Sequence, residues 1–143
     1  MCLNNWGGID HKVLEFHEYV NLFSGKSGSG KSTVMDAIQV ILYGSFSPSF
    51  LNKAADDAKN RRSVLSYLRG EQKDGSANRK DCDFCSVIAL EIEDTGTHII
   101  TCIGIAFEVR KSDSEIKKFV YFSHSGKMPE SEYLTEQGVC YSN

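Results

Sequence analysis

The chain lacks several features that would mark other classes of protein. No apolar run is long enough to span a bilayer, and the first residues lack the basic region and apolar core of a secretory signal. Internal repeats and low-complexity tracts are also missing. A cytoplasmic location without membrane contact is therefore the expectation. At 143 residues, with 41% hydrophobic and 24% charged residues, the chain is long enough for one globular domain.

An overall positive charge is also lacking, since 16 Lys and Arg stand against 19 Asp and Glu, a formal net charge of −3. A uniformly cationic protein that coats nucleic acid is thereby excluded. The charge is uneven, because residues 53–80 carry eight basic and four acidic residues. This local excess either lies near phosphate groups of a nucleotide or of DNA, or forms a solvated face.

The cysteines lack the pattern of a disulfide framework or of a zinc site. Their number, five, is odd, which favours reduced thiols. Cys82 and Cys85 have C-x-x-C spacing, but a structural zinc needs four ligands and no second pair follows at a suitable distance. His98 and Cys102 are four residues apart in a predicted strand, where they form no compact chelate. Ordinary thiols are the prediction, with a metal pair or a redox pair as alternatives.

What is present is a glycine-rich loop at residues 25–33, which reads G-K-S-G-S-G-K-S-T and fits G-x-x-x-x-G-K-[ST]. In such a loop the backbone N–H groups converge on phosphate oxygens. Lys31 places a positive charge at the β/γ-phosphates and is the predicted catalytic residue, while the Ser32 hydroxyl is the predicted Mg²⁺ ligand. ATP and Mg²⁺ are thus the predicted cofactors. The predicted binding residues are Gly25, Lys26, Ser27, Gly28, Ser29, Gly30, Lys31, Ser32 and Thr33.

The flanking residues favour a functional loop over a Gly/Ser-rich surface loop. Residues 19–23 are rich in β-formers and predict a buried strand before the loop. Residues 34–43 predict a helix covered on most sides, ended by Gly44. Strand, glycine loop and helix follow in the order that a phosphate loop requires. Trp6 is close in sequence, and it either stacks on an adenine ring or belongs to the core.

The remaining pattern predicts an α/β (α+β) fold with a mixed or antiparallel sheet packed around the loop helix. We expect one unit over residues 1–143, divided into a loop-containing core at 1–85 and a β-rich lobe at 86–143. Gly104 is expected at a bulge. The predicted strands cover residues 3–6, 11–16, 86–93, 98–109 and 116–123, and the further predicted helices cover 54–62, 63–69 and 130–137.

Two parts of a complete nucleotide-hydrolysing site are missing from the pattern. Hydrolysis needs an acidic residue at the end of an apolar strand to hold Mg²⁺. Glu91 follows an apolar run, but alternation continues beyond it, as in a half-exposed strand. An L-S-G-G-type segment is also missing. The pattern therefore indicates the front half of a nucleotide site.

An Asn-Trp pair near the start, a β-hairpin, and a loop running into S-T-V-M-D-A-I are similar to the N-terminal head segment of SMC-like ATPases. Residues 24–43 resemble the bacterial condensin MukB and JetC, the MukB-like subunit of Wadjet anti-plasmid systems. Residues 52–59, with Arg62 and the segment 66–70, resemble the JetC pattern in particular. The resemblance covers residues 3–70 and extends only loosely to the later strands.

The resemblance implies the N-terminal lobe of an ABC-type head, whose C-terminal piece carries the signature and the Mg²⁺-binding acid. The implied partners are that C-terminal head segment, a second head in a homodimer, a kleisin-type subunit and DNA. Arg61 or Arg62 would lie near the nucleotide or DNA. The family's lid-loop glutamine is expected near Gly104, where the sequence has none, and Gln72 is a poor substitute by position.

The resemblance further implies that ATP hydrolysis needs the full-length dimer and that the isolated segment is inactive. The alternatives are a transporter-type or DNA-repair-type ABC module and a non-hydrolysing nucleotide-sensing domain. A P-loop kinase fits poorly, because such folds alternate strand and helix.

Overall fold

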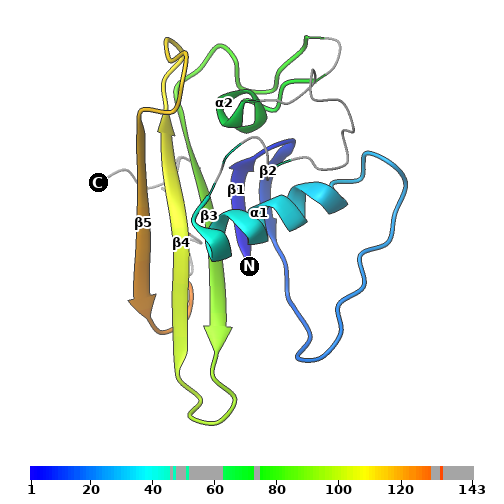
Figure 1. Cartoon of the computed structure of the whole chain (residues 1–143), viewed down its shortest axis with the longest axis vertical. Helices are drawn as coiled ribbons and strands as arrows, with labels where there is room; N and C mark the ends of the chain where they lie inside the picture. The colour runs from blue at the N-terminus through cyan, green and yellow to red at the C-terminus, as the bar shows by residue number, and fades with distance from the viewer. Residues whose placement is uncertain (46, 48–50, 52–62, 73–74, 130–132, 134–143) are drawn as a thin grey trace.

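The computed structural model describes residues 1–45, 47, 51, 63–72, 75–129 and 133. Five antiparallel strands form one sheet in the order β2-β1-β3-β4-β5, and helix α1 lies across one face of it (Figure 1). The short helix α2 lies near the end of the sheet where β1 turns into β2. The elements are β1 (Cys2–Trp6), β2 (Ile9–Val13), α1 (Lys31–Tyr43), α2 (Val64–Leu68), β3 (Phe84–Glu93), β4 (Ile100–Val109) and β5 (Lys118–Ser125).

The sheet has two different faces because side chains alternate along each strand. On the α1 face, Leu3, Ile88 and Ile105 are fully buried in the main core. Residues from both predicted parts of the chain thus share one sheet and one core. The division into 1–85 and 86–143 stays a prediction.

Helix α1 begins and ends at glycines in the left-handed conformation. Gly30 (φ 88°) precedes the helix, and Gly44 (φ 62°) follows it and donates its N–H to Val40 O at 3.0 Å. The predicted helix and its stop are confirmed. The expected coverage on most sides is confirmed only in part. Val34, Asp36, Ala37, Val40 and Ile41 are buried. Met35, Leu42 and Tyr43 are 46%, 57% and 74% exposed, so one side of the helix is open.

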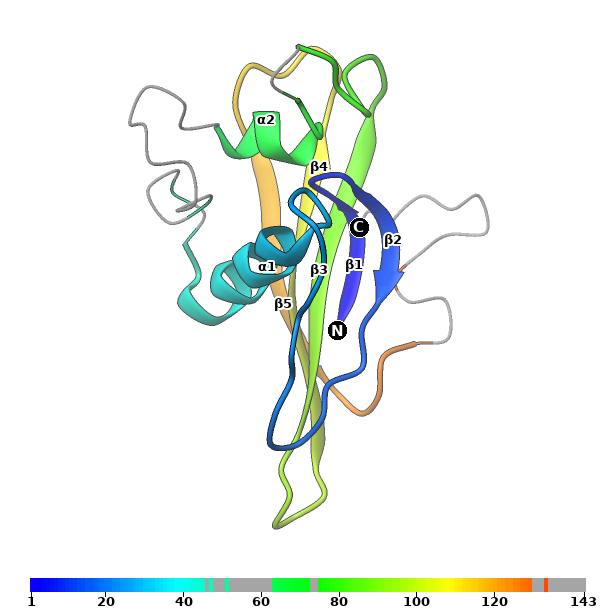
Figure 2. The same cartoon turned by 90° about the vertical axis from the view of Figure 1, so that its right-hand side faces the viewer.

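The buried strand predicted at residues 19–23 is wrong. These residues have no regular structure, and Tyr19, Val20 and Leu22 are 87%, 77% and 89% exposed. The connection from β2 to α1 loops away from the sheet in Figure 1, and Figure 2 shows it running down from β2 and back up to the start of α1. A strand needs a neighbour to bind its backbone N–H and C=O groups, and no strand in the described part of the chain pairs with this segment.

Smaller differences concern strand ends and one glycine. Strand β2 lies at Ile9–Val13, two residues before the predicted start, and β4 begins at Ile100, because His98 is in a turn with φ 57°. Gly104 is not at a bulge, since it pairs in register with Ala89 on one side and Phe122 on the other. The helices predicted at 54–62 and 130–137 lie outside the described residues, apart from Tyr133.

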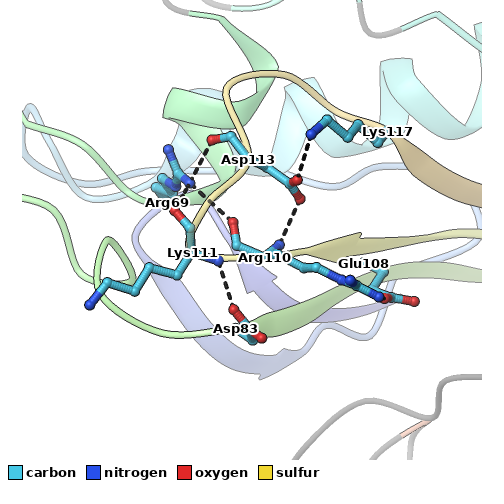
Figure 3. A network of polar contacts seen from close by, with 7 residues as sticks. All are labelled: Arg69, Asp83, Glu108, Arg110, Lys111, Asp113 and Lys117. Atoms are coloured by element: carbon cyan, nitrogen blue, oxygen red, sulfur yellow. Dashed lines mark hydrogen bonds and ion pairs between the residues drawn. The ribbon is translucent and has the colours of Figure 1, made fainter.

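Helix α2 is tied to the turn between β4 and β5 by one arginine (Figure 3). Arg69 Nη2 donates to the carbonyl oxygens of Arg110, Lys111 and Asp113 at 3.2, 3.0 and 2.9 Å. Asp113 in turn accepts a hydrogen bond from the Arg110 N–H at 2.8 Å and pairs with Lys117 at 3.3 Å. Arg69 belongs to the basic excess of residues 53–80, and its charge here serves to bind backbone carbonyls. No helix in the described residues is long and apolar enough to cross a membrane.

Candidate nucleotide-binding site

The loop ahead of α1 has a backbone that glycine permits at three places. Gly25, Gly28 and Gly30 have φ values of 153°, 83° and 88°, in the region that side-chain-bearing residues rarely adopt. At Gly25 the loop also folds tightly, because an added Cβ would lie 2.7 Å from Ser29 Oγ. The two motif glycines, Gly25 and Gly30, and the intervening Gly28 therefore permit the shape of the loop.

The Lys31 side chain folds back over this loop. Its ammonium donates hydrogen bonds to Gly25 O at 2.6 Å, Lys26 O at 2.9 Å and Ser29 Oγ at 3.2 Å. The positive charge is thus held against the loop, beside the backbone that the motif assigns to phosphate. Electrostatic attraction of an anion to this position follows from Coulomb's law.

The N-terminus of α1 supplies further donors. No side chain caps it, and its first turn contains no acidic residue. The orphan N–H groups of a first helical turn and the helix dipole both favour an anion. Ser32 is exposed in that turn, so its hydroxyl is accessible to a metal ion bound with a phosphate. The Lys31 ammonium, the exposed Ser32 hydroxyl and the uncapped start of α1 thus lie together, and their roles toward phosphate and Mg²⁺ stay a prediction.

Trp6 is a core residue and not an adenine platform. It is fully buried, with its ring centroid 4.7 Å from that of Tyr67, so a base cannot stack on it. Its indole Nε1–H donates to the carbonyl oxygen of Thr33, in the first turn of α1, at 2.8 Å. The pattern of hydrophobic residues could not foretell this contact, because it depends on where the end of β1 meets α1.

The other candidate site residues are not at the loop. Glu91 alternates with Leu90, which packs in the α1-side core, and therefore lies on the opposite face, where it accepts the Met128 N–H at 2.8 Å. Gln72 is exposed in the turn after α2. Arg61 and Arg62 lie outside the described residues.

The C-x-x-C cysteines lie in different environments. Cys82 is exposed, while Cys85 is buried, and this burial raises the pKa of the Cys85 thiol. Among the described residues no group of three His, Cys, Asp or Glu side chains is arranged to hold a metal ion.

Sequence reasoning missed Arg79. Its guanidinium donates to Leu68 O at 3.1 Å and to Gly7 O, and pairs with Asp10 at 2.6 Å. Burial lowers the pKa of Arg79, against the raising effect of Asp10, and an arginine in proteins remains charged. The only signal in the sequence was its place in a basic segment, which does not distinguish a buried arginine from a solvated one.

Residues 1–58 match a protein family described as the P-loop containing region of AAA domain. The matched residues include the glycine-rich loop and helix α1, within a small α/β domain whose sheet is antiparallel. The chain is also 33% identical over 72 residues to the SbcC subunit of the nuclease SbcCD from Staphylococcus haemolyticus. This match covers 48% of the chain and 6% of the relative's length.

Proposed function

We propose that this chain is the ATP-binding N-terminal part of an SMC-like ATPase of the MukB and JetC type, which acts on DNA. The observation that carries the proposal is the glycine-rich loop with the Lys31 ammonium 2.6 Å from Gly25 O and an uncapped helix directly after it. The match of residues 1–58 to a P-loop family supports the same assignment. A cytoplasmic location belongs to the proposal.

The residues present fit ATP and Mg²⁺. Residues 25–33 would surround the phosphates with backbone N–H groups, and Lys31 would neutralise the charge at the β/γ-phosphates. The exposed Ser32 hydroxyl would be one ligand of Mg²⁺. The bound ion, when present, would draw charge from the transferring phosphoryl group. Because Glu91 lies on the far face of the sheet, the acid that completes Mg²⁺ binding would come from another segment.

The exposed segment at residues 19–23 supports a partner beside the loop. Tyr19, Val20 and Leu22 present three large apolar side chains within four residues, each more than three-quarters exposed. Contiguous exposed apolar surface marks an interaction site in soluble proteins. We assign it to the C-terminal head segment of the same protein, which would supply the strand that residues 19–23 lack here. A second head, a kleisin-type subunit and DNA would complete the assembly.

The similarity to a nuclease subunit supports a second candidate, the ATPase part of a DNA-repair-type module. Both candidates share the loop and differ in what the whole protein does to DNA. The gene sequence downstream of the codon for Asn143 would distinguish them from a transporter-type module, which carries its signature within one domain. A long heptad region there would favour the SMC-like and repair-type interpretations.

Calorimetric titration of the chain with Mg²⁺ and ATP tests the proposal. We expect Lys31→Ala to weaken ATP binding by at least about tenfold, as for loss of a charge-assisted hydrogen bond. Lys12→Ala, which removes an exposed lysine from β2, is the matched control and should bind ATP as the wild type does. If Lys31→Ala binds ATP as tightly as the wild type does, the proposed site is contradicted. Rapid ATP turnover by the chain alone would contradict the claim that the remaining parts lie elsewhere.

A further inference from the structure

The turn between β1 and β2 contacts three segments that are far apart in the sequence. Trp6 and Gly7 of this turn meet the first turn of α1 at Thr33, the end of α2 at Tyr67, and Arg79 ahead of β3. The phosphate loop itself is exposed and makes most of its hydrogen bonds within itself. The turn is therefore a packed contact at the start of α1, directly after the exposed loop.

Trp6 anchors the helix by a single directed bond. Its Nε1–H reaches Thr33 O at 2.8 Å, one residue after Ser32. The indole cannot swing away, because it is fully buried between Tyr67 and Phe107, with ring centroids at 4.7 and 6.5 Å. A rigid donor in a packed core thus sets the position of the carbonyl, and with it the first turn of the helix.

Gly7, in the turn between β1 and β2, also lies against Thr33. Its φ of 55° is left-handed, and an added Cβ would lie 3.0 Å from Thr33 Cγ2 and 3.2 Å from Tyr67 Cε1. Any side chain at this position would therefore push on Thr33 or on the Trp6 partner Tyr67. The close approach needs glycine for both conformation and space.

Arg79 binds the turn between β1 and β2 through its guanidinium group. It donates to Gly7 O and to Leu68 O, so one guanidinium joins the turn to the last residue of α2. Asp10 at 2.6 Å and the Phe84 ring at 5.6 Å fix its position. Because these contacts go to the turn, to α2 and to β3, Arg79 acts on the phosphate loop only indirectly, through Gly7 and through the end of α2.

We propose that Trp6, Gly7 and Arg79 form a positioning unit for the phosphate loop, which holds the first turn of α1 in the orientation that binds nucleotide phosphates. This inference rests on the proposed function. The physical reason is that the N–H groups of Lys31, Ser32 and Thr33 belong to the same helical turn as the Thr33 carbonyl and move with it. A misplacement of that turn weakens several donors to one anion at once.

Replacement of the Trp6 indole by 3-benzothienylalanine tests the unit at one atom. The ring keeps its bicyclic shape, but sulfur stands in place of the N–H, so only the bond to Thr33 is lost. We expect ATP affinity to fall by about three- to tenfold, the range for one hydrogen bond. Incorporation of 5-fluorotryptophan, which retains the N–H, should restore wild-type affinity. Equal affinity for the benzothienyl and wild-type proteins would overturn the inference.

The contribution of Arg79 to the positioning unit can be tested against a matched arginine variant. Arg79→Gln should weaken ATP binding by about threefold or more, because it releases Gly7 O, with no contact to the loop itself. Arg69→Gln removes an arginine that also binds backbone carbonyls, but at the turn after β4, and should leave ATP affinity within about twofold. An equal loss of ATP affinity in both variants would show a general stability effect and would overturn the role of Arg79.

Hydrogen exchange separates this inference from the proposed function. If wild-type protein and Lys31→Ala bind ATP equally poorly, the proposed function fails, and the positioning unit is judged without ligand. The benzothienyl protein should then exchange the amides at the start of α1 faster than the wild type, with unchanged exchange in β3 and β4. Unchanged exchange at the start of α1 would overturn the positioning unit as well.

Discussion

Replacement of Gly104 by alanine should be among the most damaging single changes in the sheet. Gly104 lies in β4 between Ala89 and Phe122, and its added Cβ would lie 2.6 Å from the carbonyl oxygen of Ile88 and closer still to the Phe122 ring. Real Cβ atoms do not approach other atoms so closely, and something must move. The Phe122 ring can rotate away, but the Ile88 carbonyl is backbone in the central strand and cannot move without opening the ladder.

The expected cost is about 2–3 kcal/mol of unfolding free energy, toward the upper part of the range for overpacking. The smaller chain entropy of alanine in the unfolded state returns only about 0.4–1 kcal/mol, and this offset is included in the estimate. For a chain of this size about 1 kcal/mol corresponds to 2–4 °C, so we expect the melting temperature to fall by roughly 5–10 °C.

Urea and thermal unfolding followed by circular dichroism would measure this change. Gly8→Ala is the matched control, because Gly8 has no atom within 4 Å of an added Cβ, and its change should stay within about 0.5 kcal/mol. A cost for Gly104→Ala below about 1 kcal/mol would refute the reasoning. It would mean that the strands separate more easily at this position than the pairing indicates.

Three further predictions concern the polar contacts and the thiols. Arg69→Gln should lower unfolding free energy by about 1–2 kcal/mol, because the carbonyls of the turn after β4 lose their shared donor; an unchanged urea midpoint would contradict this. Iodoacetamide at pH 8, followed by peptide mass spectrometry, should modify exposed Cys82 at least about tenfold faster than fully buried Cys102, whose thiol pKa is raised by burial. The Arg110 N–H, aided by Lys117, holds the pKa of Asp113 below its ordinary value of 3.8, against burial. A depressed pKa gives stability that is complete above the ordinary value and is lost as pH falls through the folded value. Asp113→Asn should therefore reduce the pH dependence of stability below about pH 4, and an identical acid unfolding profile would rule this out.

Much of the fold followed from local patterns. The end of α1, the position of β1 and the long strand β3 agree with the sequence, because glycine stops and alternating apolar residues act over a few residues, whereas α1 begins at Lys31, three residues before its predicted start. Strand ends shifted where a turn residue such as His98 took a left-handed conformation. The bulge expected at Gly104 was wrong, because an isolated glycine in a strand has several causes. Its true cause, the ring of Phe122 across the pair, is a contact between strands.

The buried strand expected at residues 19–23 failed for a reason that local patterns do not contain. Its composition suits a strand, but a strand also needs a neighbour, and the described part of the chain offers none to these residues. The apolar side of α1 near Tyr43 is open in the same way. Composition shows that a segment is suited to burial, whereas only the folded structure shows whether it is buried.

The glycine-rich loop at residues 25–33 is readable from the sequence, since its motif occupies nine consecutive residues and the backbone conformation of its glycines is local. Tertiary structure alone decided that Trp6 is an internal donor to Thr33, that Arg79 binds the Gly7 turn, and that Glu91 lies on the face away from the loop. These outcomes depend on the side on which each strand presents a residue and on which turns come together. Such geometry is set by the packing of the whole sheet against α1 and α2.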